Sequence, residues 1–268
     1  MQRGDIMKRI ELWQDRMPYD CGDGFRPYLK YYEPRVMRDS YTAAVICPGG
    51  AYSHRSLYEG EGYAEFLSML GIASFVLEYR VAPSRFPAPL IDARRAVRMV
   101  RSMAEELSIS RVIIMGSSAG GHLAAITCTY LSPIEGERVD DIDDFDFLPD
   151  AQILCYPVTD IRTHRGSYDN LLGEGVTDMS EAVNPTALVT EGTPQAFIWH
   201  TANDGAVDIL GTYRFVSRLK EAGVPHELHV FPDGAHGLGL ANDEARRNLH
   251  VASWAGMLTG WLKFNHFI

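Results

Sequence analysis

A strand-like run that passes straight into a helix-like run constrains the fold of this chain more than any other feature. The run at 111–115 is β-branched and apolar, which is typical of a buried strand. Residues 116–120 read GSSAG and fit the pattern G-x-S-x-G, and the composition becomes helical from Gly121. So short a passage forces a sharp turn, and glycines two positions on either side of Ser118 let neighbouring backbone pass close by. The context predicts a nucleophile elbow that holds Ser118 above a sheet.

The neighbouring Ser117 is an alternative nucleophile, but only Ser118 has glycine at both the −2 and the +2 position. A bare G-x-S-x-G also occurs in glycine-rich turns that carry no chemistry. The catalytic interpretation of Ser118 therefore depends on whether the rest of the chain supplies a base, an acid and an oxyanion hole.

Strand-like and helix-like segments alternate along most of the chain. Further buried strands are predicted at 42–47, 73–79, 151–156, 195–201 and 227–231. Helices are predicted at 62–70, 90–107, 211–222 and 243–263, with the arginines of 90–107 pointing outward. Two early strands at 7–13 and 27–32 are expected to form an antiparallel edge pair. This alternation predicts an α/β fold with a mostly parallel central sheet, right-handed crossovers and helices on both faces.

The carboxyl ends of parallel strands meet at one edge of a sheet, where open α/β sheets bind their ligands. Segment 158–194 leaves from this edge and is longer than a tight turn needs, so we predict a cap over Ser118. The acidic stretch 135–150 enters a strand from the opposite edge. Its spacing does not fit an EF-hand, and a solvated insertion far from Ser118 is expected.

Four histidines are candidates for the base. His236 lies in a Gly-rich loop directly after the last strand, at the expected active edge, and is the predicted base. His200 ends a strand and fits a satisfied, half-buried residue. His122 follows the elbow inside a helix and is expected to pack or cap, whereas His54 lies in an early loop that could line the pocket.

Two aspartates follow the strand at 195–201. Asp204 falls at the start of the turn over the active edge, where a carboxylate can fix the tautomer of an imidazole. Asp208 directly precedes a helical run, and aspartate there suits a helix N-cap. Asp204 is therefore the predicted acid, which gives the chain order Ser, Asp, His.

An oxyanion hole needs backbone N–H groups aimed at developing negative charge. One N–H comes from Ala119, directly after the nucleophile. The small-residue loop 48–52, which reads PGGAY after an earlier strand, is the expected source of the others. An ordinary glycine turn is the alternative for this loop taken alone.

Composition and charge narrow the classes of function. The apolar fraction of 46% supports a large core, and we expect one domain over 1–268. The formal charge of −10 argues against nucleic acid or an anionic membrane as partner. The N-terminal stretch has no apolar h-region, and a cytoplasmic protein is expected. Cys47, Cys128 and Cys155 fall in apolar runs and are predicted to be buried free thiols.

The chain resembles α/β-hydrolase-fold serine esterases. More narrowly it is similar to the small lipase/esterase-like branch that includes bacterial acetyl xylan and other carbohydrate acetyl esterases. The stretches that carry this resemblance are CPGGAYSHRSLYEGEGYA, EYRVAPSRFPAPLID, GSSAGGHLA, CYPVTD, FIWHTANDGAV, ELHVFPDGAHGLGLA and a final WL. They span nearly the whole sequence.

The resemblance implies a serine carboxylic-ester hydrolase that deacetylates O-acetylated sugars or xylo-oligosaccharides without a metal or organic cofactor. The implied site comprises the catalytic residues Ser118, Asp204 and His236, the oxyanion-hole residues Gly50, Ala51 and Ala119, and the substrate-binding residues Tyr52 and His54. The expected partner is a small-molecule ester, with neither nucleic acid nor membrane, and a homo-oligomer is left open. A peptidase on the same fold is disfavoured because no propeller-sized domain is present. A non-catalytic binding protein is disfavoured by the complete triad.

Two loops depart from the patterns of related hydrolases. The oxyanion loop of such enzymes often reads H-G-G-G, and here Pro48 and Ala51 replace the first and fourth residues. Ala51 keeps its N–H but restricts φ. The acid loop usually reads D-x-x-V-P, and here Asp208 replaces the proline.

Overall fold

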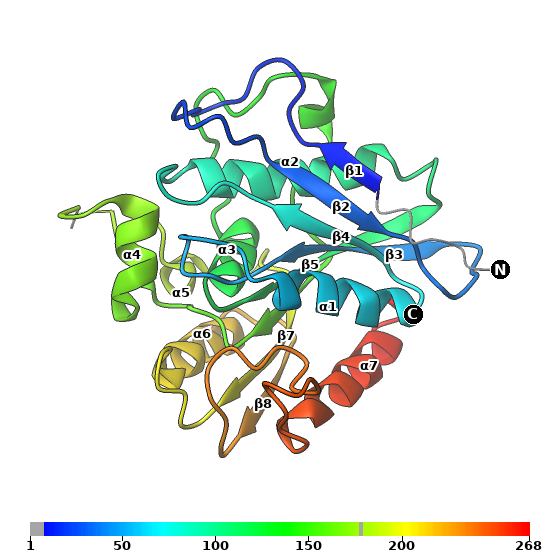
Figure 1. Ribbon diagram of the computed structural model, residues 1–268, viewed down its shortest axis with the longest axis vertical. Helices are drawn as coiled ribbons and strands as arrows, with labels where there is room; N and C mark the ends of the chain where they lie inside the picture. Colours follow the sequence, from blue (N-terminus) through cyan, green and yellow to red (C-terminus); the bar gives the residue numbers. More distant parts are fainter. Residues whose placement is uncertain (1–7, 177–178) are drawn as a thin grey trace.

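One eight-stranded sheet forms the centre of the part of the chain that the structure, a computed structural model, describes: residues 8–176 and 179–268. The strand order is β1-β2-β4-β3-β5-β6-β7-β8 (Figure 1). β2 is antiparallel to both of its neighbours, and β3 to β8 run parallel. The strands are β1 (Lys8–Glu11), β2 (Tyr28–Tyr32), β3 (Tyr41–Cys47), β4 (Ala73–Glu78), β5 (Ile109–Ser117), β6 (Ala151–Cys155), β7 (Gln195–Thr201) and β8 (His226–Phe231). The predicted antiparallel edge pair is thus confirmed, although Met7 lies outside the described residues.

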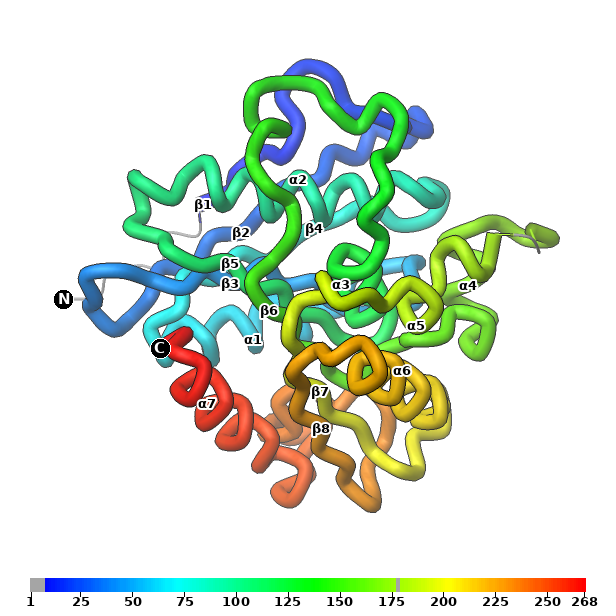
Figure 2. The backbone as a smooth tube through the Cα atoms, turned by 180° about the vertical axis from the view of Figure 1, so that it is seen from behind, coloured from blue at the N-terminus to red at the C-terminus, as the bar shows by residue number. Residues whose placement is uncertain are grey.

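Helices cover both faces of the sheet (Figures 1 and 2). One face carries α1 (Leu57–Met69) and α7 (Trp254–Phe264), and the other carries α2 (Ala88–Ser102), α3 (Ser118–Thr129) and α6 (Ile209–Glu221). The alternation of side chains along β3 explains why both faces are apolar. Val45 packs toward the α2 and α3 side, whereas Ile46 packs toward the α1 side. The predicted α/β class is confirmed.

The order of the strands locates the ligand edge. From β3 the chain passes to β4 on one side and then returns to β5 on the other, so the connections diverge between β3 and β5. In open α/β sheets such a divergence leaves a crevice at the carboxyl ends of the strands. Cys47 pairs with Gly116 there, so the loop after β3 begins beside the turn after β5.

Several helix boundaries differ from the prediction. The first helix begins earlier, at Leu57, and the helix predicted at 90–107 ends at Ser102. The helix predicted at 243–263 begins only at Trp254, after the 3₁₀ turn η3 (Val251–Ser253). Asp243 explains the delay, because its carboxylate accepts hydrogen bonds from two nearby amides and closes a turn there.

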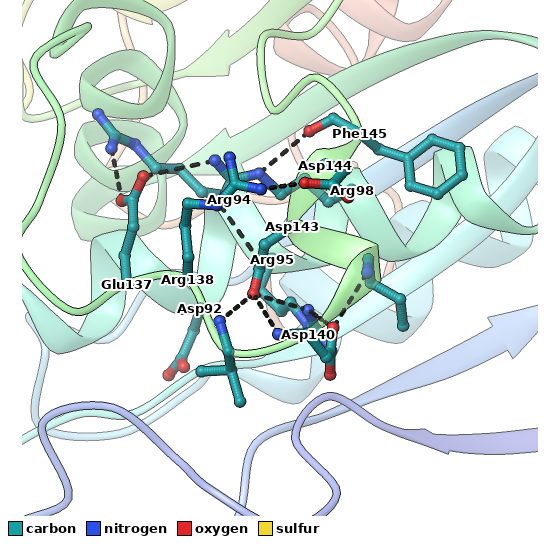
Figure 3. A network of polar contacts seen from close by, with 12 residues as sticks. Asp92, Arg94, Arg95, Arg98, Glu137, Arg138, Asp140, Asp143, Asp144 and Phe145 are labelled. Carbon is teal, nitrogen blue, oxygen red and sulfur yellow. Dashed lines mark hydrogen bonds and ion pairs between the residues drawn. The ribbon is translucent and has the colours of Figure 1, made fainter.

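The outward direction predicted for the α2 arginines is wrong. Arg94 and Arg95 are 0% exposed and Arg98 is 6% exposed. Figure 3 shows all three reaching into the connection between α3 and β6. The ring of Phe147 also covers the Arg94 guanidinium at 4.1 Å. A helical pattern cannot reveal this arrangement, because the partners lie about 40 residues further along the chain.

The solvated insertion predicted for 135–150 is only partly right, because many of its residues are exposed but Glu137 and Asp143 are buried against α2. Glu137 accepts from Arg94 at 2.7 Å, and Asp140 binds the two terminal nitrogens of Arg95 at 2.6 Å each. Asp143, in the 3₁₀ turn η1 (Asp141–Asp144), lies 3.0 Å from the same guanidinium and is buried. The carboxylates face the guanidiniums directly, which offsets the cost of removing these charges from water.

The connection that holds these carboxylates joins the sheet at the edge opposite Ser118. Asp150 binds the backbone of Val112, near the amino end of β5, whereas Ser118 follows the carboxyl end of that strand.

Cys47, Cys128 and Cys155 are buried free thiols, as predicted. No helix in the described part of the chain has both the length and the apolar character that crossing a membrane requires.

Candidate active site

The turn after β5 has the geometry of an elbow. Ser118 begins α3 with φ at +54°, a left-handed conformation that costs a non-glycine residue roughly 1 kcal/mol or more. A Cβ on Gly116 would lie 2.1 Å from the carbonyl oxygen of Gly120, and a Cβ on Gly120 would lie 2.0 Å from that of Cys47. The two glycines of the motif are therefore required by close backbone approach. The helix starts at Ser118 and not at Gly121 as predicted.

Loops from three strands bring the predicted triad residues together. Ser118 Oγ lies 2.9 Å from Nε2 of His236, in the loop after β8. Nδ1 of the same ring lies 2.7 Å from Oδ2 of Asp204, in the loop after β7. With Nδ1–H donating to the carboxylate, Nε2 is left to accept the serine proton. This is the arrangement that a general base needs in order to activate a hydroxyl.

The Asp204 carboxylate is held as an anion. Its Oδ1 accepts from the amides of Ala206 and Val207, both at 2.9 Å. Burial opposes ionisation, but hydrogen bonds from His200 and His236 outweigh it and hold the pKa of the Asp204 carboxyl well below its usual range. A fixed negative charge therefore faces Nδ1 of His236.

His200 is fully buried beneath this carboxylate, and the prediction of a half-buried residue underestimated its burial. Its Nδ1 lies 2.9 Å from the Thr212 hydroxyl, and its Nε2 lies 3.3 Å from Asp204 Oδ2. A hydroxyl that donates to Nδ1 leaves the Nε2 proton between the Val207 carbonyl oxygen, at 3.1 Å, and Asp204 Oδ2. His200 thus contacts the Asp204 carboxylate from within the protein and does not contact Ser118.

The other competing residues have structural roles. The Oγ of Ser117 is 2.9 Å from the Tyr63 hydroxyl, and Ser117 is 0% exposed. Asp208 is the N-cap of α6 and accepts from the Leu210 amide at 2.9 Å, which confirms that part of the prediction. These contacts leave Ser118 and Asp204 as the members of each pair that face His236.

The loop after β3 is strained in the manner that a glycine-rich oxyanion loop would be. Gly50 has φ at +130°, and Ala51 and Tyr52 have φ at +52° and +57°. Ala51 thus adopts the conformation that glycine would favour. Within the described residues, no hydrogen-bond acceptor is assigned to the amides of Gly50 and Ala51. The Ala119 amide lies in the first turn of α3, where N–H groups have no intrahelical acceptor.

Tyr52 does not lie where a substrate contact would place it. Its side chain is 1% exposed, and its hydroxyl lies 2.7 Å from Nδ1 of His122. His122 is buried as predicted, its Nε2 lies 2.8 Å from the Val183 carbonyl, and burial lowers its pKa to about 4. The expected contact between Tyr52 and substrate is therefore corrected: its side chain anchors the loop to α3. His54 is exposed beside Gly50.

A buried carboxylate that sequence reasoning missed lies behind the site. Glu59, in the first turn of α1, is 2% exposed. Its Oε2 accepts from the Gly49 amide at 2.8 Å, and its Oε1 accepts from the Tyr156 hydroxyl at 2.6 Å. The predicted helix begins only at residue 62, so no helical pattern indicated that Glu59 would face inward.

The segment at 158–194 carries α4 (Arg165–Leu172) and α5 (Pro185–Leu188) and contacts the site loops. Asn170 donates its side-chain amide to the Ala51 carbonyl at 2.9 Å. Burial lowers the pKa of His164, at the start of α4, and the nearby His236 lowers it further. That this segment acts as a cap over Ser118 stays a prediction, and residues 177–178 lie outside the described part.

Comparison with known proteins identifies the family. A family profile described as BD-FAE matches residues 29–219, which is well over half of the chain. The chain belongs to the BD-FAE family. The predicted resemblance to α/β-hydrolase esterases is thereby confirmed.

Curated relatives of this BD-FAE chain include endo-1,4-beta-xylanase B of Butyrivibrio fibrisolvens. It is 34% identical over 96% of this chain. An acetylxylan esterase of Xylanibacter ruminicola is 33% identical over 74% of the chain. The BD-FAE chain spans only 41% of the length of each of these two relatives.

Among solved structures, the acetyl ester-xyloside bifunctional hydrolase of Caldicellulosiruptor lactoaceticus is similar over its whole length. The TM-score is 0.91 at 36% identity, with complete coverage of both chains. A thermophilic esterase of Thermogutta terrifontis, with propionate bound, has a TM-score of 0.78 at 25% identity. The BD-FAE chain therefore shares its fold with solved esterases.

Proposed function

We propose that this chain is a serine carboxylic-ester hydrolase that works through an acyl-enzyme and removes acetyl groups from O-acetylated sugars or xylo-oligosaccharides. The observation that carries the proposal is the continuous hydrogen-bonded line from Ser118 through His236 to Asp204, with distances of 2.9 Å and 2.7 Å. Sugar acetates are favoured because xylan-related names recur among the relatives.

In the proposed first step, Ser118 Oγ attacks the ester carbonyl carbon while Nε2 of His236 takes the hydroxyl proton. The amides of Gly50, Ala51 and Ala119 stabilise the oxyanion. Collapse of the tetrahedral intermediate breaks the bond to the sugar oxygen, which receives the proton from His236. Acetylated Ser118 remains.

In the second step, water attacks the acyl carbon, with His236 as base again. The intermediate then releases acetate and returns the proton to Ser118. The Asp204 carboxylate stabilises the imidazolium that forms in both steps. No step requires a group beyond these side chains and backbone amides. We also propose that the chain forms one α/β-hydrolase domain in which 158–194 covers the site.

Paired serine variants test the proposal. We expect Ser118→Ala to abolish p-nitrophenyl acetate hydrolysis and labelling by a fluorophosphonate probe. Ser117→Ala should keep most of both, since its Oγ contacts Tyr63 and does not contact His236. Persistent labelling of Ser118→Ala would contradict the assignment of the nucleophile. Acetylated xylo-oligosaccharides and a peptide amide, assayed beside the ester, decide the substrate class.

A further inference from the structure

The first turn of α1 holds both halves of the site at once. Glu59 and Tyr58 follow the oxyanion loop directly along the chain. The Tyr58 hydroxyl donates to the carbonyl of Gly237, the residue after His236, at 2.9 Å. Glu59 faces the opposite way, into the protein, where its two oxygens bind Gly49 and Tyr156. One helical turn thus contacts the oxyanion loop and the base loop.

A chain of hydroxyl groups ends on the Glu59 carboxylate. The Tyr156 hydroxyl contacts Glu59 at 2.6 Å and the Tyr63 hydroxyl at 3.2 Å, and Tyr63 in turn contacts Ser117 at 2.9 Å. A carboxylate accepts and does not donate, so it sets one direction for the chain: Ser117 donates to Tyr63, Tyr63 to Tyr156, and Tyr156 to Glu59. The residue before the nucleophile therefore belongs to the same network.

Tyr156 connects this chain of hydroxyl groups to the proposed base, His236. Its hydroxyl also accepts from the amide of Gly239, three residues beyond His236, at 2.9 Å. Its ring packs edge-on against the His236 imidazole, with centroids 5.1 Å apart. Removing the direction imposed by Glu59 would free the Tyr156 hydroxyl to turn, and the Gly239 amide and the imidazole would lose a fixed support.

The contact with Gly49 is equally constrained. A Cβ on Gly49 would lie 2.5 Å from Glu59 Oε2, so glycine is needed for the carboxylate to reach the backbone. Gly49 directly precedes Gly50 and Ala51, the proposed oxyanion donors. Burial raises the pKa of the Glu59 carboxyl, while the hydrogen bonds from Tyr156 and Gly49 oppose that rise. Burying a carboxylate costs folding free energy, so packing alone does not explain why Glu59 lies here.

We propose that Glu59 is a positioning residue for ester hydrolysis, which fixes the oxyanion loop through Gly49 and the base loop through Tyr156. The assignment rests on the proposed function. In this role Glu59 supports the stabilisation of the transition state, because the oxyanion and the imidazolium both form only as the reaction proceeds. Its loss should therefore lower kcat and leave KM nearly unchanged.

The test compares Glu59→Gln, which keeps the size of the side chain, with Glu65→Gln, which removes the same charge from an exposed position on the same helix. On p-nitrophenyl acetate we expect Glu59→Gln to lower kcat about 10- to 100-fold, below the effect of removing an oxyanion donor outright. KM should stay within about threefold of the control, on the same principle. The kcat is taken per active site, counted by a fluorophosphonate titration run to completion.

A kcat within about threefold of the Glu65→Gln control would overturn the assignment, as would a loss confined to KM or to the count of folded sites. A wild-type chain without esterase activity would overturn both the assignment and the proposed function. Tyr156→Phe, which keeps the ring against His236, should lower kcat less than Glu59→Gln. The double variant should lose less than the product of the two single losses, since both act through one network. Multiplicative losses would contradict the shared network.

Discussion

Replacing Asp143 with asparagine would test the buried ion-pair network between α2 and the connection into β6. The Asp143 side chain is 0% exposed and lies 3.0 Å from Arg95 and 3.4 Å from Arg98. Its Oδ2 also accepts from the Val139 amide at 2.7 Å. Asparagine has nearly the same shape, so the variant removes the charge and places an amide group among donors.

The magnitude follows from what each arginine keeps. Removing one partner of a buried ion pair typically costs about 3–5 kcal/mol, because the other charge is left uncompensated. Here Arg95 retains Asp140 and Arg98 retains Glu137. We therefore expect a cost near the lower end, about 3 kcal/mol in the free energy of unfolding. For a chain of this size, that corresponds to a fall in Tm of roughly 6–12 °C.

The matched control is Asp144→Asn, one residue along the same turn. Asp144 and its partner Arg138 are each 65% exposed, and such surface pairs contribute about 0–1 kcal/mol. Thermal and urea unfolding of both variants would give the comparison, and kcat/KM at 25 °C should stay within about twofold of wild type because Ser118 lies at the other edge of the sheet. Equal melting temperatures for Asp143→Asn and Asp144→Asn would refute the reasoning. They would show that Asp143 contributes no more to stability than a solvated carboxylate, as the sequence predicted for this insertion.

Two further predictions concern the site and its support. Asp204→Asn should lower kcat by roughly 10⁴, because His236 loses its tautomer. It should also lower Tm near pH 7, because a buried carboxyl whose pKa is held low in the folded chain stabilises that chain when it is ionised. Asp208→Asn should keep its activity, because asparagine also caps helices; an inactive Asp208→Asn beside an active Asp204→Asn would contradict the assignment. The pKa of His122 is about 4 in the folded chain and 6.5 in its ordinary state, so the unfolded chain binds more protons between these values, and stability falls by about 3 kcal/mol as pH drops from 6.5 to 4. The Tm difference between wild type and His122→Gln should therefore narrow across that range, and a constant difference would contradict it.

The three side chains of the proposed triad could be brought together from the sequence because their position depends on topology alone. Parallel strands end at one edge, so a residue just past any strand must lie near the others there. Asp204 and His236 each follow a strand within a few residues, and Ser118 follows a third. Their convergence required no knowledge of side-chain packing.

Features that depend on a single distant partner could not be placed in this way. The helical pattern places Arg94 and Arg95 on the polar, outward side of an amphipathic helix. Their burial depends on carboxylates from another segment of the chain. No local pattern predicts that Tyr52 turns inward, because its inward direction depends on a φ of +57° in a strained loop. Local periodicity indicates which face of an element is apolar, but the direction of these side chains is decided by tertiary contacts.

The strained residues of the site lie in the loops after β3 and β5, on both sides of the point where the connections diverge. Contacts beyond strand pairing must therefore hold them. Ser118 after β5 and Ala51 after β3 both have left-handed backbones, which persist only when surrounding structure fixes them. Pairing of β3 with β5 fixes where each turn begins, at Cys47 and Gly116, but not how the loop beyond it is oriented. The residues beyond need further contacts. The Glu59 network reaches Gly49 on one side and Ser117 on the other, each next to the strained part of its turn. A carboxylate buried at that junction can therefore hold both turns in register with the base loop, which strand pairing cannot do.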